Sequence, residues 1–240
     1  MRSLILLVAI LGATVAQRQP SRDVINKFKE VVPKYLDSLR AEEAELAKVH
    51  AEATDIVVKF HDDVIQVKEA FIVDAISKES EMHYQIANQL ESVDGICLGF
   101  LNTSLDMSMN LAGSGFTNCI NEADDAFNGL AAEYFNVLGV KEGKLNELHL
   151  LDVFRGDNVF YTPQNIIDKL DQKMNDLIIN PESFSNDLEE AKAILNNDLL
   201  AILSVYSGCM TQAEQLLKSG VDMLMMHLTF SCLGAEILAP

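Results

Sequence analysis

Four cysteines are the residues of this chain whose type and spacing suggest the most definite chemistry. Cys97 and Cys119 are 22 residues apart, and Cys209 and Cys232 are 23 apart. Along one helix 22 residues span about 33 Å, whereas a disulfide needs Cα atoms within about 7 Å of each other. A bond inside a continuous helix is therefore excluded. Because neither interval is the Cys-x-x-Cys spacing of a redox dithiol, we expect structural bridges.

Two disulfide arrangements remain. If both cysteine-bearing segments are long helices packed antiparallel, Cys97 pairs with Cys232 and Cys119 with Cys209, and the residue numbers of these pairs sum to 329 and 328. If the chain instead turns at Ser219-Gly220, Cys209 pairs with Cys232. That alternative leaves Cys97 and Cys119 centred on residue 108, where the sequence has no turn residue. The nested antiparallel pairing is therefore preferred.

Patterns typical of catalysis and metal binding are missing. The chain has no G-x-S-x-G elbow, no H-E-x-x-H and no glycine-rich phosphate loop. A partial calcium loop begins at Asp124, but Ala126 and Phe135 stand where ligands belong. His50 and His61 share a helix face about 16 Å apart, too far for one metal ion. We expect no catalytic residue, cofactor or metal, and hence no enzyme.

Methionines gather near the cysteines. They are Met107, Met109, Met210, Met223, Met225 and Met226. Flexible thioethers fill irregular apolar space and suit adaptable ligand pockets. If the two cysteine-bearing segments pack together, their methionines share one layer, which is either ordinary core packing or the lining of a cavity for a small hydrophobic ligand.

Two short motifs would place function at the surface. Arg155-Gly156-Asp157 lies in the least regular stretch, 139–162, where an exposed loop would engage an integrin-type receptor; the alternative is a plain connection between helices. Asn102-Thr103-Ser104 is an N-glycosylation sequon, usable where it lies at the surface of an extracellular protein.

The chain begins like a secretory precursor. A short basic start precedes the apolar run Leu4 to Leu11, and small residues up to Ala16 resemble a cleavage site. We expect residues 1–16 to be a signal peptide and 17–240 a single secreted domain, with the cysteines oxidised. The apolar end from Val221 is interrupted by His227 and Glu236, which favours a packed helix over a membrane anchor.

The charge narrows the choice of partners. The chain carries 36 acidic and 18 basic residues, a formal net charge of −18. This charge repels phosphate backbones, which argues against nucleic acid, and it disfavours docking on anionic lipid. The expected partner is an extracellular protein or a small apolar ligand.

Apolar residues recur every three or four positions from Leu46 to Ala75, as in an amphipathic helix that faces a core. The sequence predicts one very long helix over 40–93, or two that meet near residues 77–80. A shorter helix with a kink at Pro33 is expected at 21–38, and two more are expected at 96–111 and 116–137, separated by Gly113-Ser114-Gly115. Another helix should run from Pro163 to residue 180, followed by a long one from about 188. The predicted fold is all-α, an elongated antiparallel helical bundle of five to seven helices with two disulfides.

The chain combines an acidic helical body, a secretory start and the Cys97–Cys119 interval, which is followed by the polar helix Cys119 to Ala126. In these features it resembles the tsetse EP family of secreted insect proteins. The likeness covers mainly residues 91–137 and the later cysteines. It implies a secreted helical protein of arthropod gut or body fluids with no assigned reaction. Our sequence-based hypothesis is a secreted, non-enzymatic protein with an extracellular binding or structural role; the alternative is a carrier of a small hydrophobic ligand.

Overall fold

The chain is helical throughout most of its length in the computed structural model, which describes residues 2–90, 93–146, 150–179 and 181–234. The elements are α1 (Arg2–Ala87), α2 (Gly95–Asn146), the 3-10 helix η1 (Leu150–Phe154), α3 (Pro163–Ile179), α4 (Pro181–His227) and the π-helical turn η2 (Leu228–Cys232). No strand occurs in these described ranges, which confirms the all-α class.

The described residues form four α-helices and the two short helical elements η1 and η2, whereas the sequence predicts five to seven helices. At residues 77–80, where one long helix or two were expected, α1 continues as one helix, and it also includes Pro33. Two anticipated breaks are absent: α1 runs through residues 38–40, where a shorter helix was expected to end, and α2 runs through the Gly113-Ser114-Gly115 stretch. A glycine inside a helix costs only about 1 kcal/mol relative to alanine. Burial of an apolar helix face outweighs that cost, because packing supplies most of the stability of helices in proteins.

Two local expectations at helix ends have different outcomes. Pro163 is the first residue of α3, as its preset φ angle and missing amide hydrogen favour. Ser21, a candidate helix cap in the sequence, lies inside α1, where it is 8% exposed and its hydroxyl donates to the Val159 carbonyl at 3.0 Å. Its role is a tertiary hydrogen bond.

The chain divides into two compact units. Unit 1 comprises Met1–Ala53 and Glu133–Ile194, and unit 2 comprises Thr54–Ala132 and Leu195–Pro240. Each unit therefore draws on two separate stretches of the sequence, and each has buried apolar clusters of its own.

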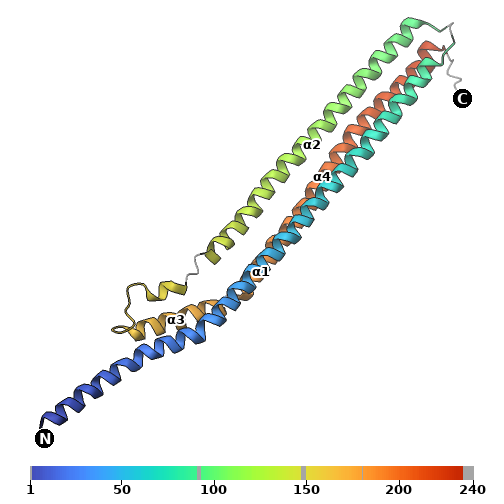
Figure 1. The fold of residues 1–240 in the computed structure, drawn as a ribbon. Helices are drawn as coiled ribbons and strands as arrows, with labels where there is room; N and C mark the ends of the chain where they lie inside the picture. Colours follow the sequence, from blue (N-terminus) through green and yellow to red (C-terminus); the bar gives the residue numbers. More distant parts are fainter. Residues whose placement is uncertain (1, 91–92, 147–149, 180, 235–240) are drawn as a thin grey trace. The chain divides into compact units, whose positions relative to one another are not determined.

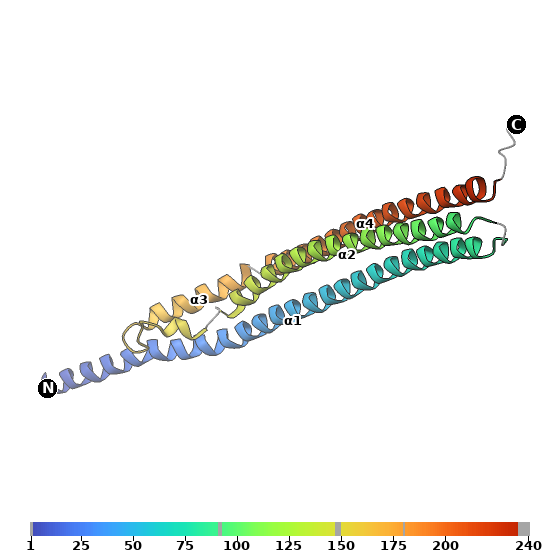
Figure 2. The ribbon, with the colours of Figure 1, turned by 90° about the horizontal axis from the view of Figure 1, so that it is seen from above.

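Unit 2 packs segments of α1, α2 and α4 around one core. Figures 1 and 2 show the three helices side by side, with α2 running opposite to α1 and α4. The buried residues form two clusters, one around Phe116, Tyr206 and Met210 and the other around Leu101 and Leu105. Each cluster takes residues from all three helices, so the amphipathic stripe of α1 meets the partners that its pattern requires.

One apolar cluster of unit 1 forms where α1 meets η1 and α3, and the unit has further buried residues such as Val49 and Leu188. Val24 and Val31 of α1 pack against Val153 of η1 and against Ile166 and Leu170 of α3. The Lys27 ammonium lies 2.6 Å from the Asp171 carboxylate at the edge of this cluster. An ion pair thus supplements the apolar contact between the two helices.

Candidate functional site

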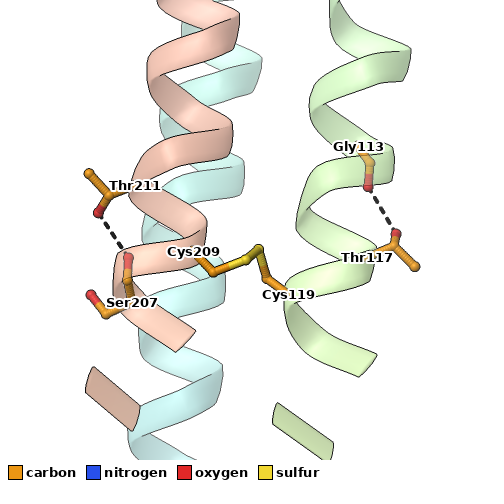
Figure 3. The surroundings of a disulfide bond; sticks show 6 residues. All are labelled: Gly113, Thr117, Cys119, Ser207, Cys209 and Thr211. Atoms are coloured by element: carbon orange, nitrogen blue, oxygen red, sulfur yellow. Dashed lines mark hydrogen bonds between the residues drawn. A yellow bond between two sulfur atoms is a disulfide. The ribbon is translucent and has the colours of Figure 1, made fainter. Parts of the chain in front are cut away.

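The two disulfides of unit 2 join α2 to α4 and to η2, the π-helical turn that follows α4. Cys97 is bonded to Cys232 and Cys119 to Cys209, with Cα atoms 5.7 Å apart in each pair. Figure 3 shows the second bridge crossing from one helix to the other. This is the nested antiparallel arrangement that the sums of residue numbers favour.

A π-helical turn absorbs the one-residue mismatch between the two cysteine intervals. In η2 the Leu233 amide donates to the Leu228 carbonyl at 3.0 Å, a bond that spans five residues. A π turn accommodates an additional residue without ending the helix. Because η2 ends at Cys232, the longer interval on α4 matches the shorter one on α2.

Between the bridges, α2 and α4 approach closely at glycines. A Cβ atom added to Gly115 would lie 3.0 Å from the Ala213 Cβ, and one added to Gly220 would lie 3.1 Å from the Ser108 Oγ. In the sequence both glycines are candidate turn or break positions. Their actual role is to let two helix backbones come together.

Large apolar side chains remain exposed on both sides of this helix contact. We call them the seam face; its members are 54–76% exposed and comprise Phe100, Met107 and Leu111 of α2 and Leu216, Met223 and Met226 of α4. The Phe100 ring lies 6.3 Å from the His227 ring, which joins the two stripes at one end. The residues three or four positions from Leu111 and Leu216 are all uncharged. The seam face is therefore apolar and uncharged around Leu111 and Leu216, whereas Asp222 lies four positions before Met226 at its other end.

The six methionines do not form one layer. Met210 is fully buried and Met109 and Met225 pack against the core, whereas Met107, Met223 and Met226 belong to the seam face. Helical geometry explains the division, because residues two positions apart on a helix point about 200° apart. Met109 lines the α1–α2 groove described below.

Unit 2 also contains an apolar groove between α1 and α2, with a volume of about 280 Å³. We call it the α1–α2 groove; its lining residues are Lys68, Ile72, Ala75 and Ile76 of α1 and Met109, Ala112, Gly113, Phe116, Thr117 and Ile120 of α2. A second pocket of about 220 Å³ lies beside the Cys119–Cys209 bridge and includes Tyr206. The Tyr206 hydroxyl is buried without a hydrogen-bond partner, and burial raises its pKa.

The sequon residue Asn102 lies on α2, half-buried. Its side-chain oxygen is 3.2 Å from the His83 Nδ1 of α1, and the neighbouring Thr103 hydroxyl donates to the Gly99 carbonyl. Glycosylation at Asn102 stays a prediction, and a glycan there would have to leave the amide oxygen free to meet His83.

The Arg-Gly-Asp triplet of unit 1 is built into its surroundings. The Asp157 carboxylate accepts hydrogen bonds from Lys169 at 2.5 Å and Asn165 at 3.0 Å, and these contacts lower its pKa. Gly156 has φ of 80°, a conformation that favours glycine. An adhesion receptor needs a free carboxylate, whereas this one, with its side chain 9% exposed, is already bound within the unit.

Two further properties bear on the site. Among the described residues, no group of three or more His, Cys, Asp or Glu side chains is placed to hold a metal ion. By length and composition alone the stretch Ser185–Cys232 passes as a candidate membrane span, because it contains an 18-residue window with a mean hydropathy of 1.3. In unit 2 that same stretch supplies core residues such as Met210, together with Cys209 of α4 and Cys232 of η2.

The chain matches no family model, no curated protein and no solved structure. The resemblance to the tsetse EP family stays an expectation from the residues, and function is inferred from the geometry of the chain itself.

Proposed function

We propose that this chain is a secreted, non-enzymatic helical protein that acts by binding, and that the seam face is its contact surface. The two disulfides support an oxidising, extracellular-type environment. Secretion after cleavage of residues 1–16, and the elongated antiparallel bundle expected for residues 17–240, belong to the same proposal. N-terminal sequencing of the protein recovered from culture medium, and its small-angle X-ray scattering, would test these two parts.

The observation that supports binding most strongly is the seam face itself. Soluble monomers rarely leave a large contiguous apolar patch exposed unless it meets another molecule. Half of the seam face is methionine, a side chain that adapts its shape to different apolar partners. The two bridges hold α2 and α4 in register, so this face is presented by a preorganised pair of helices.

The methionines make the proposal testable even when the partner is unidentified. The full chain would be produced with a photoactivatable methionine analogue and illuminated in the extracellular fluid of its source. We expect cross-links to another molecule from Met107, Met223 and Met226, whose side chains are exposed.

The buried methionines provide an internal control for this experiment. Met82 and Met210 are 1% and 0% exposed, so their cross-links should stay within the chain. Leu216→Glu should abolish the intermolecular cross-links, whereas Ile25→Glu, which changes an exposed apolar residue of unit 1, should leave them intact. Intermolecular cross-links that are absent from all three seam methionines would overturn the proposal.

The α1–α2 groove favours a second candidate function, a carrier of a small hydrophobic ligand. Its apolar lining and its volume of about 280 Å³ place it near the lower end of the range for ligand pockets, roughly 300 Å³. Uptake of an uncharged fluorescent probe such as N-phenyl-1-naphthylamine would support this candidate. Absence of uptake at micromolar protein concentration would remove it.

A further inference from the structure

Lys68 is the basic residue that lines the α1–α2 groove. It takes part in no ion pair among the described residues, although acidic residues outnumber basic ones two to one. Its helix neighbours three and four positions away explain this, because Val64, Ile65, Phe71 and Ile72 are all apolar. By contrast, Lys59 and Lys78 on the same helix each contact an acid four positions away.

The groove offers one other polar side chain, Thr117. Its hydroxyl donates to the Gly113 carbonyl at 2.9 Å, as Figure 3 shows, so its proton is already engaged. The Lys68 ammonium therefore supplies the groove with its available hydrogen-bond donors and its positive charge. Ile72 and Ile76 continue from it along the same side of the groove, one and two helical turns further on.

We propose that the α1–α2 groove binds an amphiphile with a single alkyl chain and an anionic head, such as a fatty acid, with the carboxylate paired to Lys68. The inference rests on the carrier candidate and names its ligand class. The apolar walls receive the chain, and Lys68 selects the charge of the head. A volume of about 280 Å³ suits a chain of moderate length.

The head-group preference is tested by competition between three ligands of equal chain length. Dodecanoate, dodecanol and dodecyltrimethylammonium would each displace N-phenyl-1-naphthylamine from the full-length oxidised protein. We expect dodecanoate to bind about two- to five-fold more tightly than dodecanol, the range of an exposed ion pair. The ammonium ligand should bind more weakly than dodecanol, and added salt should reduce both differences.

Substitutions then assign the preference to Lys68. Lys68→Met should remove the advantage of dodecanoate and leave dodecanol unchanged, whereas Lys68→Arg should keep it. Lys218→Met is the matched control, because Lys218 also lies in unit 2 outside the ion pairs among described residues and does not line the groove. A dodecanoate preference that survives Lys68→Met would overturn the assignment.

A glycine pair tests whether the probe occupies this groove. A Cβ atom at Gly113 or at Gly99 would meet nothing within 4 Å, so both positions accept a side chain, but Gly113 alone lines the groove. Gly113→Leu should abolish probe uptake and Gly99→Leu should not. If the wild-type chain takes up no probe, both the carrier candidate and the proposed anionic ligand are refuted. If all three ligands displace the probe equally, the carrier candidate stands and the preference for an anionic head group is refuted.

Discussion

Unit 2 joins its helices with two disulfides and apolar clusters, whereas unit 1 combines buried apolar residues with ion pairs between separate segments. The ion pairs of unit 1 that join separate segments include Lys27–Asp171, Lys48–Glu189, Lys141–Asp187, Lys169–Asp157 and Lys192–Glu52. Among the described residues of unit 2, Lys78–Glu214 is the one ion pair that joins two helices.

This difference follows from where the acidic residues of the chain lie. Between residues 95 and 121, α2 has one charged residue, Asp106, so its contact with α4 must rely on apolar packing and covalent bonds. In unit 1 every helix has acidic residues, and lysines at the contacts offset their repulsion. The low charge of this stretch of α2 also accounts for the apolar character of the α2 side of the seam face.

The largest expected effect comes from truncating the core of either unit. Leu105 of unit 2 and Leu170 of unit 1 are both fully buried, so replacement of either by alanine should cost about 2–5 kcal/mol of unfolding free energy. Hydrogen exchange should show the loss of protection concentrated in the unit that bears the substitution. Equal loss in both units would show that the division is not an energetic one.

Removal of one disulfide should affect unit 2 selectively. The double variant Cys119→Ser with Cys209→Ser opens a loop of 90 residues and should lower the unfolding free energy by about 2–4 kcal/mol, measured by urea denaturation. Changing both cysteines avoids a leftover thiol. A reductant should have little additional effect on hydrogen exchange in unit 1, since its described part has no cysteine.

A smaller effect, of opposite sign, is expected at the unpartnered Tyr206 hydroxyl. A buried hydroxyl without a partner costs free energy, so Tyr206→Phe should raise the unfolding free energy by about 1 kcal/mol. Tyr134 of unit 1 also has an unpartnered buried hydroxyl, and Tyr134→Phe should give a gain of the same sign. Destabilisation by Tyr206→Phe would mean that this hydroxyl has a bonding partner, such as water or a ligand, in solution.

The smallest effect concerns pH and belongs to unit 1. Hydrogen bonds from Lys169, then Asn165, hold the pKa of Asp157 below its ordinary value of about 4. Its ionised form therefore stabilises the folded state above pH 4, and this contribution is lost as the pH falls through the lowered pKa. Asp157→Asn should lower the melting temperature at pH 7 and make no difference near pH 2; an equal loss at both values would refute the electrostatic explanation.

The sequence predicted some features of unit 2 well because they depend on local periodicity and length. The apolar stripe from Leu46 to Ala75 predicted a long helix, and the nearly equal cysteine intervals favoured the nested pairing that the structure contains. The roles of Gly115 and Gly220 were not predictable, because a glycine that permits close helix packing and one that permits a turn look alike in sequence. The seam face was not predictable from the sequence, because the exposure of a side chain depends on which helix lies beside it.

By itself, the sequence determined that this chain is helical, acidic and able to form two bridges between antiparallel helices. These properties follow from residue types, a period of three to four residues and fixed lengths along the chain. The tertiary structure alone decided that Met210 is core while Met223 is surface, that Asp157 is bound within unit 1, and that Lys68 meets an apolar groove. Each of these depends on contacts between residues distant in sequence, whose side chains have no local signature of the partner they will meet.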